Sequence, residues 1–187
     1  EMCIRDSYCA DVYPNSRNTV VELDAKLAEY VREWFDIPKS PRVKIRVGDA
    51  GTVTRSFAPA SRDVVLRDVF AVDKTPAELT SVDFVREVDH SLAPGGLYIL
   101  NCGDGPSLDG ARAEVAALFE VYEQVCLVAD AAMLKGRRRG NIIIAASHSP
   151  LPAAGSAEAA AISRTLMGGG VPAQYRDSAQ TRQFARL

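Results

Sequence analysis

The chain has 187 residues, 47% of them hydrophobic and 25% charged, which is ordinary for one folded domain with a tail. Its 22 Lys and Arg against 24 Asp and Glu give a net charge of −2, so no overall attraction to nucleic acid or to an anionic membrane is expected. The longest apolar stretches are much shorter than a membrane span, and no secretory signal pattern is visible at the start. We therefore expect a cytoplasmic protein.

The cysteines and histidines do not predict a metal site. Cys3, Cys9, Cys102 and Cys126 form no CxxC pair, and the two histidines are far apart in sequence. Cys102 and Cys126 fall in predicted strands, so we expect small buried side chains with reduced thiols.

The first seven residues differ from everything that follows. Residues 1–7 show neither helical nor strand periodicity, and residues 2–7 resemble the conceptual translation of a transposase sequencing adaptor. We therefore expect an artefact at this end, with the true protein beginning upstream and this chain a fragment of it. An ordinary disordered N-terminus is the alternative.

The first half of the chain alternates predicted strands and helices. Residues 8–18 predict the end of a helix followed by a turn, and 19–23 predict a buried strand. Asp24 then caps a helix with an apolar stripe that continues to about residue 35. Residues 43–47 alternate apolar and basic side chains, which favours a half-exposed strand. Residues 63–66 are nearly all apolar, which favours a more central strand.

The next elements continue this alternation. Residues 80–91 predict a helix whose capping box has Thr80 at the N-cap and Asp83 three residues later. Residues 97–101 predict a strand after a Pro-Gly-Gly turn, and 108–119 predict an alanine-rich helix.

A hairpin and a tail complete the chain. Residues 124–129 and 141–147 predict two antiparallel strands, because too few residues separate them for an obvious crossover helix. Residues 153–187 form an Ala- and Gly-rich tail. Within it, 156–167 predict a short helix, and residues from about 174 onward are expected to be poorly ordered.

Three predicted strands are each followed by an acid. Glu22 closes the first strand, Asp49 follows the second, and Asp68 follows the third. Parallel α/β sheets bind ligands at the carboxyl ends of their strands, so the three acids are expected to surround one pocket suited to an adenosyl ligand and a reacting amine. Each acid also has a structural interpretation: Glu22 as a helix-start acid, Asp49 as a turn residue, and Asp68 as a partner of Arg67.

Four segments in this order resemble the spermidine synthase family: VVELD at 20–24, GDA at 48–50, DVVLRDVF at 63–70 and LAPGGLY at 92–98. The wording at 67–70 and the later LKGRR resemble the family's divergent actinobacterial branch, in which some members are fused to a membrane transporter domain. The resemblance covers about residues 12–152.

The resemblance implies a class I methyltransferase-like, Rossmann-like α/β fold. Its doubly wound, mostly parallel sheet would end in an antiparallel hairpin. Residues 8–152 would be a partial domain, because the first strand and glycine loop of the fold would lie upstream. We therefore expect the chain alone to bind adenosyl ligands poorly and to be inactive.

The resemblance also implies an activity, the transfer of an aminopropyl group from decarboxylated S-adenosylmethionine to a polyamine. Carried over by position, Glu22 would accept hydrogen bonds from the ribose hydroxyls, and Asp49 would accept one from the adenine amine. Ala50 would lend a backbone N–H to the adenine ring, and Asp68 would take the proton of the attacking amine.

The sequence departs from the family beside Asp68. The usual Ser-Ser/Thr-Asp-Pro stretch reads Val-Phe-Ala-Val at 69–72, so the second acid is missing unless Asp73 reaches the same space. Arg67 replaces an apolar residue, and would either pair with Asp68 and weaken it as a base or favour an anionic substrate. Both changes argue against putrescine as the acceptor.

Other interpretations stay open. An S-adenosylmethionine-dependent methyltransferase shares the adenosyl-binding acids, and a non-catalytic nucleoside-binding relic fits the missing acid. Asn101 and Asp104 either line the pocket or belong to a turn, which is the favoured interpretation of Asp104. The basic run at 137–139 is interpreted as a solvated hairpin turn, not a nucleic-acid site. A homodimer and a fused upstream membrane domain are further expectations from the resemblance.

Overall fold

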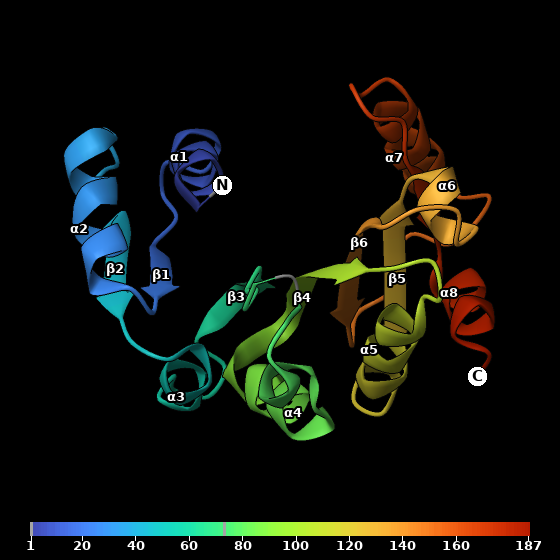
Figure 1. Ribbon diagram of the computed structural model, residues 1–187, viewed down its shortest axis with the longest axis horizontal. Coiled ribbons are helices and arrows are strands. Elements are labelled where there is room, and N and C mark those ends of the chain that lie inside the picture. Colours follow the sequence, from blue (N-terminus) through green and yellow to red (C-terminus); the bar gives the residue numbers. More distant parts are fainter. Residues whose placement is uncertain (1, 73) are drawn as a thin grey trace. The chain divides into compact units, whose positions relative to one another are not determined.

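The computed structural model describes residues 2–72 and 74–187, with side chains described from residue 7 onward. The chain divides into two compact units, Glu1–Ser56 (unit 1) and Phe57–Leu187 (unit 2), which are described separately. Both units alternate helices and strands (Figure 1), so the expected α/β class is confirmed. None of the helices in the described residues is long and apolar enough to cross a bilayer.

Unit 1 is a two-stranded parallel sheet with helices around it. Its elements are α1 (Met2–Val12), β1 (Asn18–Glu22), α2 (Ala25–Trp34), β2 (Val43–Val47) and α3 (Ala50–Arg55). The expected cap of α2 is confirmed, since the Asp24 side chain accepts hydrogen bonds from the backbone N–H groups of Lys26 and Leu27. A small core holds the unit together: Ala10, Val31, Ile37 and Val43, with Val20 and Ile45 packed against them.

Helix α1 differs from the prediction for the first residues. The sequence predicts no regular structure over residues 1–7, but the backbone from Met2 onward is helical. Ala10, near the C-terminal end of this helix, is buried. Arg42 donates a hydrogen bond to the Ala10 carbonyl, which ties this end of α1 to the start of β2.

Unit 2 contains a five-stranded sheet of order β3-β4-β6-β5-β7. Its strands are β3 (Arg62–Arg67), β4 (Leu92–Asp104), β5 (Gln124–Ala129), β6 (Gly140–Ser147) and β7 (Gln174–Arg176). Its helices are the 3-10 helix η1 (Ala77–Thr80), α4 (Val82–Ser91), α5 (Asp109–Phe119), α6 (Ala131–Leu134), α7 (Ala157–Met167) and α8 (Ser178–Ala185). β3 and β4 are parallel, and the expected antiparallel pairing of β5 with β6 is confirmed.

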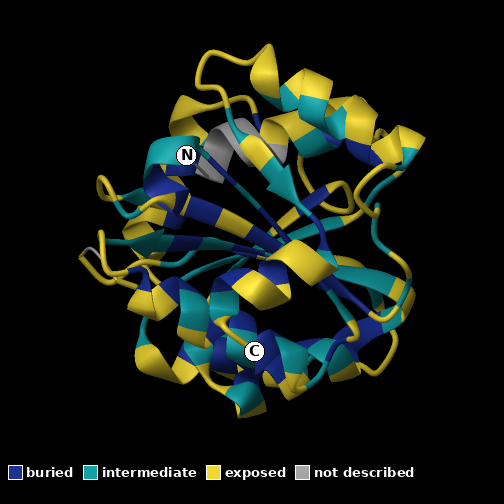
Figure 2. Ribbon diagram, turned by 90° about the vertical axis from the view of Figure 1, so that its right-hand side faces the viewer, coloured by how far each residue is buried: buried dark blue, intermediate teal, exposed yellow. Residues whose placement is uncertain are grey.

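One face of the unit 2 sheet is covered by α4, α5 and α8, which contact one another and the strands beneath them. Alternate residues of β4 are buried on this face, namely Tyr98, Leu100 and Cys102. Figure 2 shows buried residues along the strands and on the inner sides of the helices. This alternation decides which side chains of β3 and β4 face α5.

The apolar sequence of β3 predicts a central strand, but β3 lies at the edge of this sheet. Its ladder is with β4, and Val64 and Leu66 on its other face are 53% and 43% exposed. An apolar run therefore does not by itself show burial on both faces, because the strand order also decides it.

The start of α4 also differs from the prediction. Thr80 ends η1, and Ser81 is the N-cap, accepting a hydrogen bond from Phe84 N. Asp83 accepts a hydrogen bond from Arg86. The 3-10 turn takes up the residue that the capping-box pattern assigned to the cap.

The last residues are ordered where the sequence predicts poor order. β7 pairs with β5, and α8 begins with a capping box in which Asp177 and Gln180 bond each other's backbone N–H groups. Thr181 and Phe184 of α8 are buried. The polar composition of this segment predicted poor order, but α8 packs against β5 and α5, which the local sequence does not reveal. The predicted helix before it is confirmed as α7, with Ser156 as its N-cap.

Candidate functional site

Two of the predicted site residues meet at one edge of the unit 1 sheet. β1 and β2 are parallel, and Glu22 at the end of β1 pairs with Val47 at the end of β2. The backbone N–H of Gly48 donates to the Glu22 carbonyl at 2.9 Å, which holds the two strand ends together. Asp49 follows directly, so both acids lie at the carboxyl edge, as the sequence predicts.

The Glu22 carboxylate is oriented by its own chain. Its Oε1 accepts a hydrogen bond from Asp24 N at 2.9 Å, and the residue is half-buried. A carboxylate has two oxygens and about four lone-pair positions, so one backbone donor leaves capacity for a ligand diol.

Asp49 is the N-cap of α3. Its Oδ1 accepts from Thr52 N and from Thr52 Oγ1, both at 2.8 Å, and these donors lower the pKa of the Asp49 carboxyl. The structural role considered for Asp49 is therefore present. Because both bonds use Oδ1, Oδ2 can still accept from a ligand. Ala50, the first residue of α3, has a backbone N–H that the helix cannot use.

Asp68 belongs to unit 2 and follows β3 directly. Asn101 Nδ2 donates to Asp68 Oδ1 at 3.0 Å. Asn101 lies within β4, immediately after Leu100, the register partner of Arg67. Asp68 and Asn101 each follow one member of the register pair Arg67 and Leu100, so the hydrogen bond joins side chains at the same level of two parallel strands.

Asn101 offers an additional acceptor beside Asp68. Its Oδ1 is buried and has no hydrogen-bond partner among the described residues. A buried amide oxygen without a donor is costly, so this atom is suited to accept from a ligand N–H. The sequence left the role of Asn101 open. A polar side chain in an otherwise apolar strand was the signal that favoured a site.

Arg67 points into the interior instead of toward Asp68. Its side chain is 4% exposed, Nη1 donates to the Leu79 carbonyl at 2.7 Å, and Nη2 donates to the Glu114 carboxylate. The predicted pairing with Asp68 is therefore wrong. The guanidinium is buried and paired with Glu114, so it does not present its charge for direct contact with a substrate.

Phe70 and Asp104 occupy the same end of the sheet. A Cβ added at Gly103 would lie 3.0 Å from the Phe70 ring, so the ring packs directly on the Gly103 backbone. Asp104 is the last residue of β4, and its carboxylate accepts hydrogen bonds from Gly105 N and from Ala111 N of α5, so it has a structural role at the start of that helix. Asp73, the possible replacement for the missing acid, lies outside the described residues.

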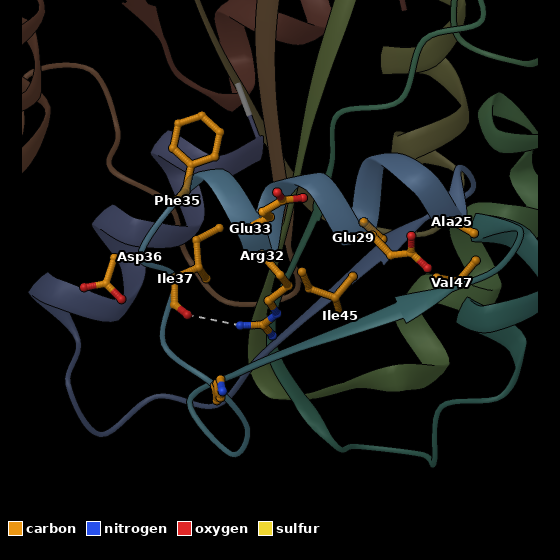
Figure 3. A pocket seen from close by; sticks show the side chains of 11 residues that line it. Ala25, Glu29, Arg32, Glu33, Phe35, Asp36, Ile37, Ile45 and Val47 are labelled. Carbon is orange, nitrogen blue, oxygen red and sulfur yellow. Dashed lines mark hydrogen bonds between the residues drawn. The ribbon is translucent and has the colours of Figure 1, made fainter.

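A groove in unit 1 lies between α2 and β2 (Figure 3). Arg32 lies along it and donates hydrogen bonds to the carbonyls of Ile37, Pro38 and Val43. These bonds tie α2 to the chain leading into β2, so the groove has a structural explanation. Neither Glu22 nor Asp49 lines it.

Metal binding has no support in the described part of the chain. No group of three or more His, Cys, Asp and Glu side chains in residues 2–72 and 74–187 could hold a metal ion. Cys9, Cys102 and Cys126 are free thiols, the last two buried, and burial raises the pKa of both. Cys3 lies outside the described side chains.

A solved structure matches almost the whole of this chain. A probable spermidine synthase from Corynebacterium glutamicum has a solved structure that is 58% identical and matches with a TM-score of 0.95. The match covers 98% of this chain and 66% of that chain. The chain belongs to the spermidine synthase-like family. No family model matches it.

Curated relatives of this family member have two kinds of name. A probable polyamine aminopropyl transferase of Bifidobacterium longum is 28% identical over 57% of this chain and 24% of its own length. The eEF1A lysine and N-terminal methyltransferase of Mus musculus is 31% identical over 58% of this chain and 17% of its own length. The chain therefore spans less than a quarter of either relative.

A more distant solved structure shows the fold alone. The human methyltransferase-like protein 13 in complex with SAH is 19% identical, with a TM-score of 0.62 over 96% of this chain and 76% of that chain. The class I methyltransferase-like fold expected from the sequence is therefore confirmed.

Proposed function

We propose that this chain carries the adenosyl-binding and amine-activating residues of an aminopropyltransferase that uses decarboxylated S-adenosylmethionine and a polyamine acceptor. The observation that carries the proposal is the Asp68 carboxylate at the end of β3, held by Asn101 at the same level of β4. Family membership supports it, since the Corynebacterium relative is named a probable spermidine synthase.

The reaction asks two things of Asp68. An amine is a nucleophile only after it loses a proton, and an ionised carboxylate within hydrogen-bond reach can take that proton. The amine nitrogen then forms a bond to the aminopropyl carbon attached to the sulfonium. The carbon–sulfur bond breaks with its electron pair going to sulfur, which releases methylthioadenosine. The sulfonium is already an activated leaving group, so positioning supplies much of the remaining rate.

Asn101 is given a supporting role. Its Nδ2–H bond fixes one oxygen of Asp68, and its buried Oδ1 can accept a second hydrogen bond from the acceptor amine. The site then offers one negative charge, on Asp68, and one neutral acceptor, on Asn101. It suits an acceptor amine that carries one positive charge at this point better than an acceptor with two closely spaced positive charges.

The adenosyl-binding role is given to unit 1. The two ribose hydroxyls would donate to Glu22, whose carboxylate is oriented by Asp24 N. The adenine amine would donate to Asp49 Oδ2, and the ring would accept the free N–H of Ala50. The lowered pKa of Asp49 keeps this group ionised and therefore an acceptor.

The test compares Asp68→Asn with Asp63→Asn, which removes an exposed acid from the same strand. Methylthioadenosine formation from decarboxylated S-adenosylmethionine and a polyamine is measured with the full-length protein that the gene encodes. We expect Asp68→Asn to lower kcat by about 10²- to 10⁴-fold, the range for loss of a general base, and Asp63→Asn to leave it unchanged. Unchanged turnover in Asp68→Asn would remove the role given to Asp68.

A methyltransferase is the second candidate, favoured by the 31% identity to the mouse enzyme. The two activities differ in product. Incubation with S-adenosylmethionine would give S-adenosylhomocysteine from a methyltransferase, whereas an aminopropyltransferase gives methylthioadenosine from the decarboxylated form. Binding of both ligands without either product would indicate a non-catalytic nucleoside-binding protein.

A further inference from the structure

A buried ion pair lies directly behind the proposed base. We infer that Glu114 is a positioning residue for Asp68: by holding the Arg67 guanidinium in the interior, it keeps that cation away from the Asp68 carboxylate. The inference rests on the proposed function for the role of Asp68, and it adds a residue that acts on the base from α5.

Strand geometry separates the two neighbouring side chains. Successive residues of a strand point to opposite faces, so Arg67 faces α5 while Asp68 turns the other way. The partners agree with this division. Arg67 pairs in register with Leu100, which is buried beneath the helices, and Asp68 is bonded by Asn101, the next residue of β4.

Strand geometry directs Arg67 to the helix side, and Glu114 holds its guanidinium there. Glu114 is 6% exposed and Arg67 4%, and the guanidinium donates to the Glu114 carboxylate and to the Leu79 carbonyl. Burial raises the pKa of Glu114, and the adjacent Arg67 opposes this rise. A buried pair of this kind depends on both members, because removing one leaves an uncompensated charge.

Loss of the Glu114 charge leaves the cation without its counter-ion. Arg67 Nε already has no hydrogen-bond partner among the described residues, and the remaining acceptor is a single backbone carbonyl. A guanidinium in that position gains by turning toward another carboxylate, and Asp68 is the next residue along the chain. An Asp68 carboxylate engaged by Arg67 would exchange its bond with Asn101 for an ion pair and would be unavailable to the amine.

The experiment uses three variants of the complete protein. Glu114→Gln removes the charge and keeps the shape. Arg67→Met combined with Glu114→Leu removes both charges, a replacement that buried pairs often tolerate. Asp109→Asn is the matched control, since Asp109 is another α5 acid that pairs with an arginine, Arg112, but is exposed. Each variant is measured for kcat and KM, for thermal stability, and for the NMR resonances of the Asn101 side-chain amide.

We expect Glu114→Gln to lower kcat by about tenfold or more, because Asp68 is diverted from the amine, and to shift the Asn101 amide resonances. The double variant should regain most of the lost kcat and the original Asn101 resonances, and Asp109→Asn should resemble the wild type. Rescue by removing the cation is the result that a merely structural pair would not give.

Two results would overturn the inference. One is a folded Glu114→Gln protein with normal kcat and unchanged Asn101 resonances. The other is a folded double variant that is no better than Glu114→Gln in either readout. If the wild type shows no aminopropyl transfer, the proposed function fails, but the Asn101 resonances still decide whether Glu114 controls the surroundings of Asp68.

Discussion

The acids of unit 1 and the acid of unit 2 are held in place in different ways. Glu22 is bonded by a backbone N–H two residues away, and Asp49 by the N–H and hydroxyl of a residue three positions later. Asp68 is bonded by Asn101, 33 residues away, and Arg67 beside it by Glu114, 47 residues away. Local sequence is therefore enough to orient the first two carboxylates, whereas the third depends on the packing of β3, β4 and α5.

The apolar core of unit 1 is smaller than that of unit 2. Unit 1 has a small cluster around Val43, and several large apolar side chains of α2 remain exposed, among them Trp34 at 64%. The Tyr30 and Trp34 rings stack on each other at 4.7 Å. Unit 2 buries many side chains of β5 and β6, including Leu127, Ile142 and Ile144. We therefore expect unit 2 to be the more stable of the two.

The largest expected effect is a core truncation in unit 2. Ile144 in β6 is fully buried, and Ile144→Ala should lower the free energy of unfolding by about 2–5 kcal/mol, because it removes buried methyl groups and leaves a cavity. Urea unfolding followed by far-UV circular dichroism measures the change. Ile143→Ala, in the same strand but 38% exposed, is the control and should cost much less. Equal losses would contradict the proposed difference in burial.

A smaller effect is expected from the cap of α2 in unit 1. Asp24→Ala removes an acceptor for two backbone N–H groups and should cost about 0.5–2 kcal/mol of stability. Trp34, the one tryptophan of the sequence, lies in α2, so its fluorescence reports on unit 1. We expect the fluorescence transition to move to lower urea, and Asp24→Asn to retain most of the stability. A fluorescence transition at higher urea than the circular dichroism transition would reverse the order of stability of the units.

Ligand binding provides the next comparison. Glu22→Gln should weaken binding of methylthioadenosine, because an amide has one acceptor oxygen where the carboxylate has two. Asp68→Asn should leave this affinity nearly unchanged, since its proposed role is proton transfer. Isothermal titration calorimetry with the complete protein measures both. Equal weakening by the two substitutions would contradict the separate roles.

The smallest expected effect concerns pH and a histidine of unit 2. His148 Nε2 lies 2.9 Å from Asp89 Oδ1, its Nδ1 contacts Glu123 Oε2, and the Tyr122 ring packs against it. Glu123 and Asp89 raise the pKa of His148 above 6.5, while His148 lowers the pKa of Glu123 below 4.5. The cluster therefore stabilises the fold most between these two values.

The sign follows from the two shifts. The His148 contribution is present below its unfolded pKa and is lost as the pH rises through the raised folded value. The Glu123 contribution is present above its unfolded pKa and is lost as the pH falls through the lowered folded value. The His148→Gln protein should therefore melt below the wild type near pH 5.5, which lies between the ordinary pKa values of 4.5 for Glu and 6.5 for His. At pH 9, where His148 is neutral, the two proteins should melt close together. An equal difference in melting temperature between the two proteins at both pH values would contradict this expectation.

The sequence predicted what depends on nearby residues. The alternation of strands and helices along the chain, the antiparallel pairing of β5 with β6 and the Asp24 cap follow from local periodicity and cap chemistry, and the structure contains them. The edge position of β3 and the ordered end of the chain were missed, because both depend on pairing with distant strands.

Glu114 could have been found from spacing. It lies in α5 three residues after Ala111 and four before Leu118, within a stripe of buried positions. A charged residue in such a stripe indicates a buried partner, because an unpaired buried charge is too costly. The identity of that partner, Arg67, required the fold.

The place of β6 in the strand order has a consequence for how the protein is made. β4 and β5 are synthesised first, but they are not neighbours, because β6 lies between them. During translation the sheet of unit 2 therefore remains in two parts until residues 140–147 leave the ribosome. Until then β4 and β5 each have an unpaired edge that can pair with the wrong strand. A chain that stops before Gly140 would contain the β3–β4 pair and β5 but not the strand that joins them.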